Sequence, residues 1–274
     1  MPAINTNAAA NAAVRYLNLN SAQETSSLSK LSSGSRITSA SDDAAGLAIS
    51  TRISSDVTTL QQAATNASQA TSILQTADGG ASNISDILAR MKSLASESAS
   101  GTTTDSSRAY INSEFSQLSS EIDSIASGTR YSGQSLLDGT SVFATGVSVL
   151  VGSSSTDTIT VTLSSLKASA LGVSTLDVST QAGANTALTA LDTAINTVSA
   201  ARASIGAQES RFNFSSDSIS TQTQNLQSAN SAIKDVDIAA EQAKLSSAEV
   251  KTQAAVSAEA AANQMPQYLL KLLG

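Results

Sequence analysis

Large apolar residues recur at every seventh position along the C-terminal half of the chain. They are Leu191, Val198, Ile205, Phe212, Ile219, Leu226 and Ile233. The positions three further on are mostly small or polar: Ala194, Ala201, Gln208, Ser215, Gln222, Ala229 and Val236. A seven-residue period keeps one helix face against a partner helix, whereas the stripe of a straight amphipathic helix drifts by about 20° per heptad. The pattern therefore favours a loosely packed coiled coil over an ordinary amphipathic helix in a globule.

Long helices are also expected in the N-terminal half, because the only prolines are Pro2 and Pro266. One apolar stripe runs through Val57, Leu60, Ala64, Ala67, Thr71 and Leu74, and resumes after Asp78–Gly80 with Ile84, Ile87, Leu88, Met91 and Leu94. A third helix, ending at Gly128, carries Ile111, Phe115, Leu118, Ile122 and Ile125 on one face. These stripes predict a coiled-coil-like rod of long antiparallel helices.

Strict alternation of apolar and polar residues interrupts this helical pattern between the two halves. Val147, Val149 and Val151 precede the turn-forming sequence GSSSTD, and Ile159, Val161 and Leu163 follow it. Alternation flanking a turn predicts a half-buried β-hairpin. The expected fold class is therefore mainly α, with a small β-hairpin insert in the rod.

The two ends of the chain, residues 1–31 and 240–274, are compatible with helix but poor in large apolar groups. Isolated helices of this kind are marginal, because nucleation is costly and little burial offsets it. We expect helical terminal tails that are disordered in the monomer and become ordered against neighbouring chains.

The segment SSGSRITSASDDAAGLAIS, from Ser32 to Ser50, suits a joint between two helices. Gly34 would end the first helix, and Ser41 or Asp42 would cap the second. The alternative is a cation held by Asp42 and Asp43. Two adjacent carboxylates fall far short of the six to eight oxygens of a calcium cage, so the joint is favoured.

The chemistry of enzymes is poorly represented. The chain has no Cys and no His, and its formal net charge is −7. These features exclude disulfides and thiolate metal sites, and they disfavour nucleic-acid binding, which needs a basic surface. Three S-x-x-K matches are expected by chance in so serine-rich a chain. No catalytic residue, cofactor or metal ligand is predicted, and no apolar run is long enough to insert into a membrane.

Several motifs resemble those of the bacterial flagellins. LSKLSSGSRITSASDDAAGLAIS (residues 28–50), INTN (4–7) and VRYLNLN (14–20) resemble the N-terminal region of that family. SIGAQESRF (204–212), AIKDVDIAAE (232–241) and ANQMPQYLLKLL (262–273) resemble its C-terminal region. The resemblance covers roughly residues 1–140 and 185–274, so the chain resembles a short flagellin without the variable outer domains.

The resemblance implies five segments. They are an N-terminal core tail and spoke (1–45), N-terminal rod helices (46–139), a β-hairpin and connecting region (140–185), a C-terminal rod helix (186–232) and a C-terminal core tail (233–274). It implies a structural subunit, not an enzyme, that polymerises into the extracellular flagellar filament used for motility. The tails of such a subunit form coiled coils on assembly.

The resemblance also implies partners. They are further copies of the chain, the flagellar type III export apparatus and its chaperone, the cap and hook-associated proteins, and the vertebrate innate immune receptor for flagellin. An export route of this kind would explain the lack of a signal peptide. The alternatives are a hook–filament junction protein and a surface adhesin or polysaccharide-binding module that uses the hairpin.

Two sets of residues follow from the family's motifs. Residues for subunit assembly are Arg36, Asp42, Asp43, Asp235, Asp237, Glu241, Ala254, Ala258, Leu269 and Leu270. Residues for contact with the immune receptor are Arg90, Leu94 and Glu114.

Overall fold

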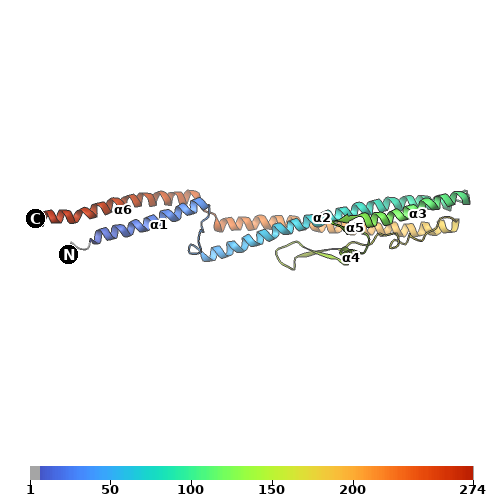
Figure 1. The fold of residues 1–274 in the computed structure, drawn as a ribbon, viewed down its shortest axis with the longest axis horizontal. Coiled ribbons are helices and arrows are strands. Elements are labelled where there is room, and N and C mark those ends of the chain that lie inside the picture. The colour runs from blue at the N-terminus through green and yellow to red at the C-terminus, as the bar shows by residue number, and fades with distance from the viewer. Residues whose placement is uncertain (1–6, 274) are drawn as a thin grey trace. The chain divides into compact units, whose positions relative to one another are not determined.

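The computed structural model describes residues 7–273, with the side chains of 7–265 (Figure 1). It contains the long helices α1 (Ala8–Ser33), α2 (Ala44–Ala99), α3 (Asp105–Gly128), α5 (Gln181–Lys234) and α6 (Ile238–Leu273). Between α3 and α5 lie the strands β1 (Arg130–Tyr131) and β2 (Gln134–Ser135), the short helix α4 (Val142–Thr145), and the strands β3 (Val147–Leu150) and β4 (Thr158–Val161). The predicted mainly α fold with a β-hairpin insert is confirmed.

The chain divides into two compact units. The first, called here the tail unit, comprises Met1–Ser55 and Asn225–Gly274. The second, the rod unit, comprises Asp56–Gln224. Each unit brings together segments from both halves of the sequence.

Helices α2 and α5 form the antiparallel seam of the rod unit. The guanidinium of Arg202 donates to both carboxylate oxygens of Asp78, at 2.8 and 3.1 Å, and Lys92 pairs with Asp192. The residue further along α2 pairs with the residue that comes earlier in α5, so the two helices run antiparallel. The predicted heptads of α5 are confirmed as far as Ile219, because its buried residues include Leu191, Ala194, Val198, Ile205, Gln208, Phe212 and Ile219. Beyond that point Leu226 and Ile233 are only half-buried, Gln222 and Ala229 are exposed, and Val236 lies past the end of the helix.

The stripe predicted for α2 is only partly correct. Buried residues follow a regular heptad: Leu60, Ala63, Ala67, Ala70, Leu74, Ala77, Ala81, Ile84, Leu88, Met91 and Ala95. Ala64 and Thr71, which the sequence assigned to the seam, are half-buried at its edge. Alanines occupy several consecutive faces of this helix, so hydrophobicity alone does not fix which of them faces α5.

Helix α3 packs on the seam through Ile111, Phe115 and Ile122, as its apolar stripe predicted. Its C-terminal end comes very close to α2 at Gly80, where a Cβ would lie 2.4 Å from Oγ1 of Thr129. A side chain at position 80 would therefore push the two helices apart. Gly80 costs α2 some helix propensity but permits this approach.

The predicted hairpin is formed by β3 and β4, which pair antiparallel from Val147↔Val161 to Leu150↔Thr158. Ile159 and Val161 point into the core, and the alternate threonines are exposed. Asp157 holds the turn by accepting a hydrogen bond from the backbone N–H of Ser154 at 3.0 Å. The sequence did not predict the smaller β1–β2 hairpin, which turns through Ser132 and Gly133, both at positive φ.

Helix side chains hold the irregular segment between β4 and α5. Gln208 accepts from the N–H of Thr162 at 2.9 Å and donates to its carbonyl oxygen at 3.0 Å. The Asp123 carboxylate accepts from the N–H of Ala168 at 2.9 Å, and the Asn112 amide oxygen accepts from that of Val178 at 3.0 Å. Buried backbone groups here are satisfied without regular secondary structure.

Candidate assembly surface

Helices α1 and α6 run antiparallel side by side in the tail unit (Figure 1). Asn7 donates to the carbonyl oxygen of Ala262 at 2.8 Å, and Ser27 donates to Oε1 of Glu241 at 2.7 Å. These contacts lie near opposite ends of the helix pair. The predicted helical tails are therefore confirmed, whereas their disorder in the monomer stays a prediction.

The seam between α1 and α6 is poor in large apolar groups. On α1 it comprises Ala10, Ala13, Leu17, Asn20, Glu24, Ser27 and Leu31, and on α6 Glu241, Leu245, Ala248, Thr252, Ala255, Glu259 and Ala262. Burying a large apolar side chain contributes roughly 1.5–3 kcal/mol, and alanine contributes far less. The pair is therefore weakly held for helices of this length.

The tail unit instead exposes its large apolar side chains. Among the described residues these are Val14, Tyr16, Leu19, Leu28, Ile49, Ile238, Val250, Val256 and Met265. The larger rod unit exposes only Tyr110, Val142 and Phe214 within its described residues. Apolar surface gathered in one unit marks a surface that other molecules cover.

Two joints connect the tail helices to α2 and α5, and they are hydrogen-bonded to each other. Gly34 ends α1 in the left-handed region, at φ 68°. Beyond it the N–H of Arg36 donates to the carbonyl oxygen of Lys234 at 2.6 Å, and the N–H of Val236 donates to that of Gly34 at 3.1 Å. The predicted joint at Gly34 is confirmed, and the second joint fixes its path.

Arg36 binds within its own chain. Its guanidinium donates to the carbonyl oxygen of Ile233 through Nε at 3.2 Å and Nη2 at 2.7 Å. A cation at this C-terminal end of α5 satisfies an orphan carbonyl and complements the helix dipole. In assembly, a neighbouring copy would have to bind the guanidinium N–H groups that do not bond Ile233. An assembly role for Arg36 stays a prediction.

The predicted cap of α2 is wrong by one residue. The helix begins at Ala44, and Asp43, not Ser41 or Asp42, is the cap, because its Oδ1 accepts from the N–H of Gly46 at 2.8 Å. A Cβ at Gly46 would lie 2.4 Å from Oδ2 of Asp43, so the capped turn needs glycine there. Ser, Asp and Asp in a row can all cap a helix, and the sequence alone does not rank them.

Asp42 holds the preceding turn. Its Oδ2 accepts from the N–H groups of Thr38 and Ser39, both at 3.0 Å, and from the Thr38 hydroxyl at 2.9 Å. These bonds, first those from the Thr38 and Ser39 backbone, lower the pKa of the Asp42 carboxyl. Both adjacent carboxylates thus serve the backbone of the joint, as the non-metal interpretation requires.

The second joint uses its acidic residues in the same way. Asp235 accepts from the Ser231 hydroxyl. Asp237 caps α6, since its Oδ1 accepts from the N–H of Ala240 at 3.0 Å. The predicted assembly residues of both joints therefore shape the chain, and any contact with neighbouring copies stays a prediction.

Glu241 is the buried carboxylate of the tail seam, with only 4 % of its surface exposed. Lys244 donates to its Oε2 at 2.9 Å and Ser27 to its Oε1. These two bonds, with that from Lys244 the larger effect, lower the pKa of the Glu241 carboxyl. Glu241 therefore ties α1 to α6 in its ionised form.

Because the folded-state pKa of Glu241 is depressed, its contribution is complete above the unfolded pKa and is lost as pH falls through the folded one. We expect E241Q to destabilise the helix pair at neutral pH. The difference from wild type should shrink as the pH falls below the ordinary glutamate pKa and through the lowered pKa of Glu241, because the wild-type carboxylate then becomes protonated. Denaturant unfolding followed by circular dichroism across this pH range measures it. E249Q, at an exposed position, is the control, and a pH-independent effect of E241Q would contradict the prediction.

Other predicted assembly residues lie along α6. Ala254 and Ala258 are exposed on the folded chain, whereas Ala255 between them is buried in the seam. Leu269 and Leu270 lie in the last turns of α6, where the side chains are outside the described residues. Their assembly role stays a prediction.

The predicted receptor residues lie in the rod unit. Arg90 donates to Oε1 of Glu114 through Nε at 3.0 Å and Nη2 at 2.7 Å, and both side chains are about half exposed. Leu94 is 2 % exposed and packs in the core. The Leu94 side chain is therefore not at the surface of the folded chain, and its contact with a receptor stays a prediction.

None of the His, Cys, Asp and Glu side chains of the described residues form a group of three that could hold a metal ion. Among the helices as described, none combines the length and apolar character that crossing a membrane requires.

Known proteins resemble the chain along nearly its whole length. Residues 4–142 match the bacterial flagellin N-terminal helical region, and residues 188–273 match the bacterial flagellin C-terminal helical region. The chain is 36% identical over 272 residues to a flagellin of Halalkalibacterium halodurans, covering 98% of this chain and 99% of that one. It is 35% identical over 283 residues to a flagellin of Listeria monocytogenes, with the same coverage.

A solved structure has a similar fold. The crystal structure of Bacillus cereus flagellin, 33% identical, superposes with a TM-score of 0.52 and covers 61% of this chain and 94% of that one.

Proposed function

Because the chain belongs to the bacterial flagellin family, we propose that it polymerises through its tail unit, whose helices complete their packing only among other copies. The chain is a structural subunit of the flagellar filament, which serves motility. The observation that carries the proposal is the concentration of exposed large apolar side chains on a weakly packed helix pair. Neighbouring copies would bury that surface and offset the entropy of ordering the tails.

The charge distribution also supports polymerisation through the tail unit. The tail unit contains eight basic and eight acidic side chains, whereas the rod unit contains seven basic and 14 acidic ones and so carries the whole net charge of −7. Neutral tail units can gather without net repulsion, whereas rod units of neighbouring copies repel each other. The joints at Gly34–Asp43 and Asp235–Asp237 support the proposed spoke between core tail and rod.

The remaining partners are proposed from family membership. The chain is secreted through the flagellar type III export apparatus with its chaperone, and it contacts the cap and hook-associated proteins at the filament ends. A weak tail seam supports this route, because helices with little buried apolar surface unfold at small cost. Export places the filament outside the cell.

Seeded polymerisation of the purified chain tests the proposed function. We expect short filament fragments to elongate in proportion to the protein added, as measured by electron microscopy. A hook–filament junction protein would cap the seeds without extending them. Failure to elongate in any salt condition would refute the proposal.

Recognition by the vertebrate immune receptor is a second proposal. It is supported by the exposed Arg90–Glu114 pair on neighbouring helices α2 and α3. A receptor reporter assay with the purified monomer measures it, with Arg90→Ala as the matched variant. Equal signals from wild type and variant would argue against this contact.

A further inference from the structure

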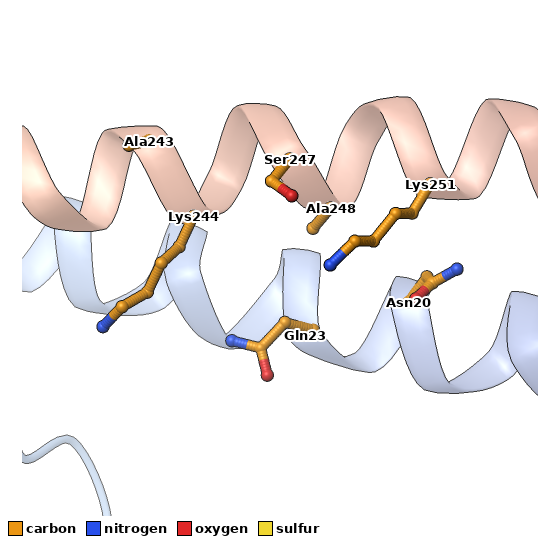
Figure 2. A pocket seen from close by; sticks show the side chains of 7 residues that line it. All are labelled: Asn20, Gln23, Ala243, Lys244, Ser247, Ala248 and Lys251. Carbon is orange, nitrogen blue, oxygen red and sulfur yellow. The ribbon is translucent and has the colours of Figure 1, made fainter.

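A groove of about 540 Å³ lies between α1 and α6 on one flank of their seam (Figure 2). Lys244, Ser247 and Lys251 line it from α6, and Asn20 and Gln23 face them from α1. No carboxylate lines the groove itself among the described residues. The groove therefore presents two ammonium groups, a hydroxyl and two amides, which together suit a carboxylate.

The two lysines differ in how far they are already used. Lys244 donates to the buried Glu241 at 2.9 Å. Lys251 makes no hydrogen bond or ion pair with the described residues, and its side chain extends back along the groove toward Ala248 (Figure 2). An exposed lysine beside an apolar surface is available to a partner.

The α1 side of this flank also exposes apolar surface. Tyr16 is four residues before Asn20, and Leu19 is four residues before Gln23, so each lies one turn along the same helix face. They are 57% and 60% exposed. A partner seated here would bury apolar side chains beside the lysines.

The opposite flank of α6 is complementary. At about 100° per residue, Glu249 lies roughly 160° around the helix from the centre of the lysine groove. It is exposed and has no ion-pair or hydrogen-bond partner within the described residues. Val256, one heptad further along the same flank, is 45% exposed.

We propose that the lysine groove of one copy binds Glu249 of a second copy of this chain. The proposal rests on polymerisation as the proposed function. It names a charge contact that arranges the tail units of neighbouring copies. Groove and carboxylate lie on opposite flanks, so each copy offers its groove to one neighbour and Glu249 to another. Such a head-to-tail contact leaves both partners free to bind further copies and produces an open fibre.

Charge reversal tests the contact in seeded polymerisation of the full-length chain. We expect K251E and E249K each to raise the critical concentration by about five-fold or more at low salt, because each places like charges together. The variant carrying both substitutions should polymerise nearly as well as wild type. R211E, at an exposed rod position, is the control for a change of net charge, and circular dichroism checks that all variants remain helical.

An equimolar mixture of the two single variants tests the pairing most directly. The altered groove of the K251E copy accepts the lysine that the E249K substitution introduces, and the unaltered groove of the E249K copy accepts Glu249 of the K251E copy. We expect the mixture to polymerise at a concentration at which neither variant does alone. Elongation of the mixture no better than that of its components would overturn the proposal.

Two further results would separate the contact from the function. Wild-type behaviour of E249K beside a defective K251E would overturn the pairing while polymerisation stands. Failure of the wild-type chain to form filaments would refute the proposed function together with the contact. In about 1 M salt, charges are screened beyond about 3 Å. A smaller polymerisation defect of the variants in that salt would support the charge contact.

Discussion

A chain truncated after Asp237 should form no filaments under conditions in which the full chain polymerises. The truncation removes α6, and with it the partner of α1, the buried Glu241 and the exposed Ile238, Val250, Val256 and Met265. Without that surface, no burial offsets the cost of ordering tails among neighbours. Sedimentation and electron microscopy after seeding measure the loss, which we expect to be complete.

The same truncation should leave the rod unit folded. Its seam residues all lie within 56–224, and Ile219, the last buried residue of α5, precedes the deleted segment by 19 positions. Circular dichroism should show a cooperative melting transition close to that of the full chain. The control is a chain with the exposed hairpin turn at 153–156 shortened, which should still polymerise. Long filaments built by the truncated chain would refute the role proposed for the tail unit.

The buried face of a helix can be predicted from the sequence only where large apolar residues are confined to one face. In α5 only one face carries Leu191, Val198, Ile205 and Phe212, so period and phase are both fixed. In α2, alanines at positions 63, 64 and 67 leave the phase open, and Ala64 and Thr71 were assigned to the seam in place of the adjacent Ala63 and Ala70. Long periodic patterns thus predict elements better than they predict which small side chain is buried.

The joints show a similar limit. Gly34 was identified because only glycine adopts its positive φ without strain. The cap was missed because Asp42 and Asp43 both accept from backbone N–H groups, Asp43 from Gly46 in the first turn of α2 and Asp42 from Thr38 in the turn before it. Nor could a sequence pattern reveal that Arg36 reaches the last turn of α5, at a sequence separation of 197.

The segment between β4 and α5 was predicted as a connecting region, but its path was not. It has neither helical nor alternating periodicity, and its backbone is held by single polar side chains on distant helices. Asp123 and Gln208 reach it at separations of 45 and 46 residues. Gln208 is a polar residue at a buried seam position, a signal that becomes visible only after the seam is known, whereas Asp123 is exposed and carries no such signal.

Phe212→Ala should destabilise the rod unit by roughly 3–5 kcal/mol, the cost of deleting a buried phenyl ring together with the cavity left behind. Phe212 is fully buried at the α5 seam, with 0% exposure. For a unit of this size the loss corresponds to a fall of about 10 °C or more in Tm. Thermal and denaturant unfolding of the monomer measure it.

Phe214→Ala is the matched control, two residues along the same helix and 72% exposed. Alanine raises helix propensity equally at both positions, so that effect cancels when the variants are compared. We expect Phe214→Ala to change the unfolding free energy by no more than about 0.5 kcal/mol. If the two variants were equally stable, the aromatic ring would not be packed between α5 and α2, and the seven-residue period would not mark a buried seam. A large difference would show that the heptad position, not the residue type, decides how much a phenylalanine contributes to this rod.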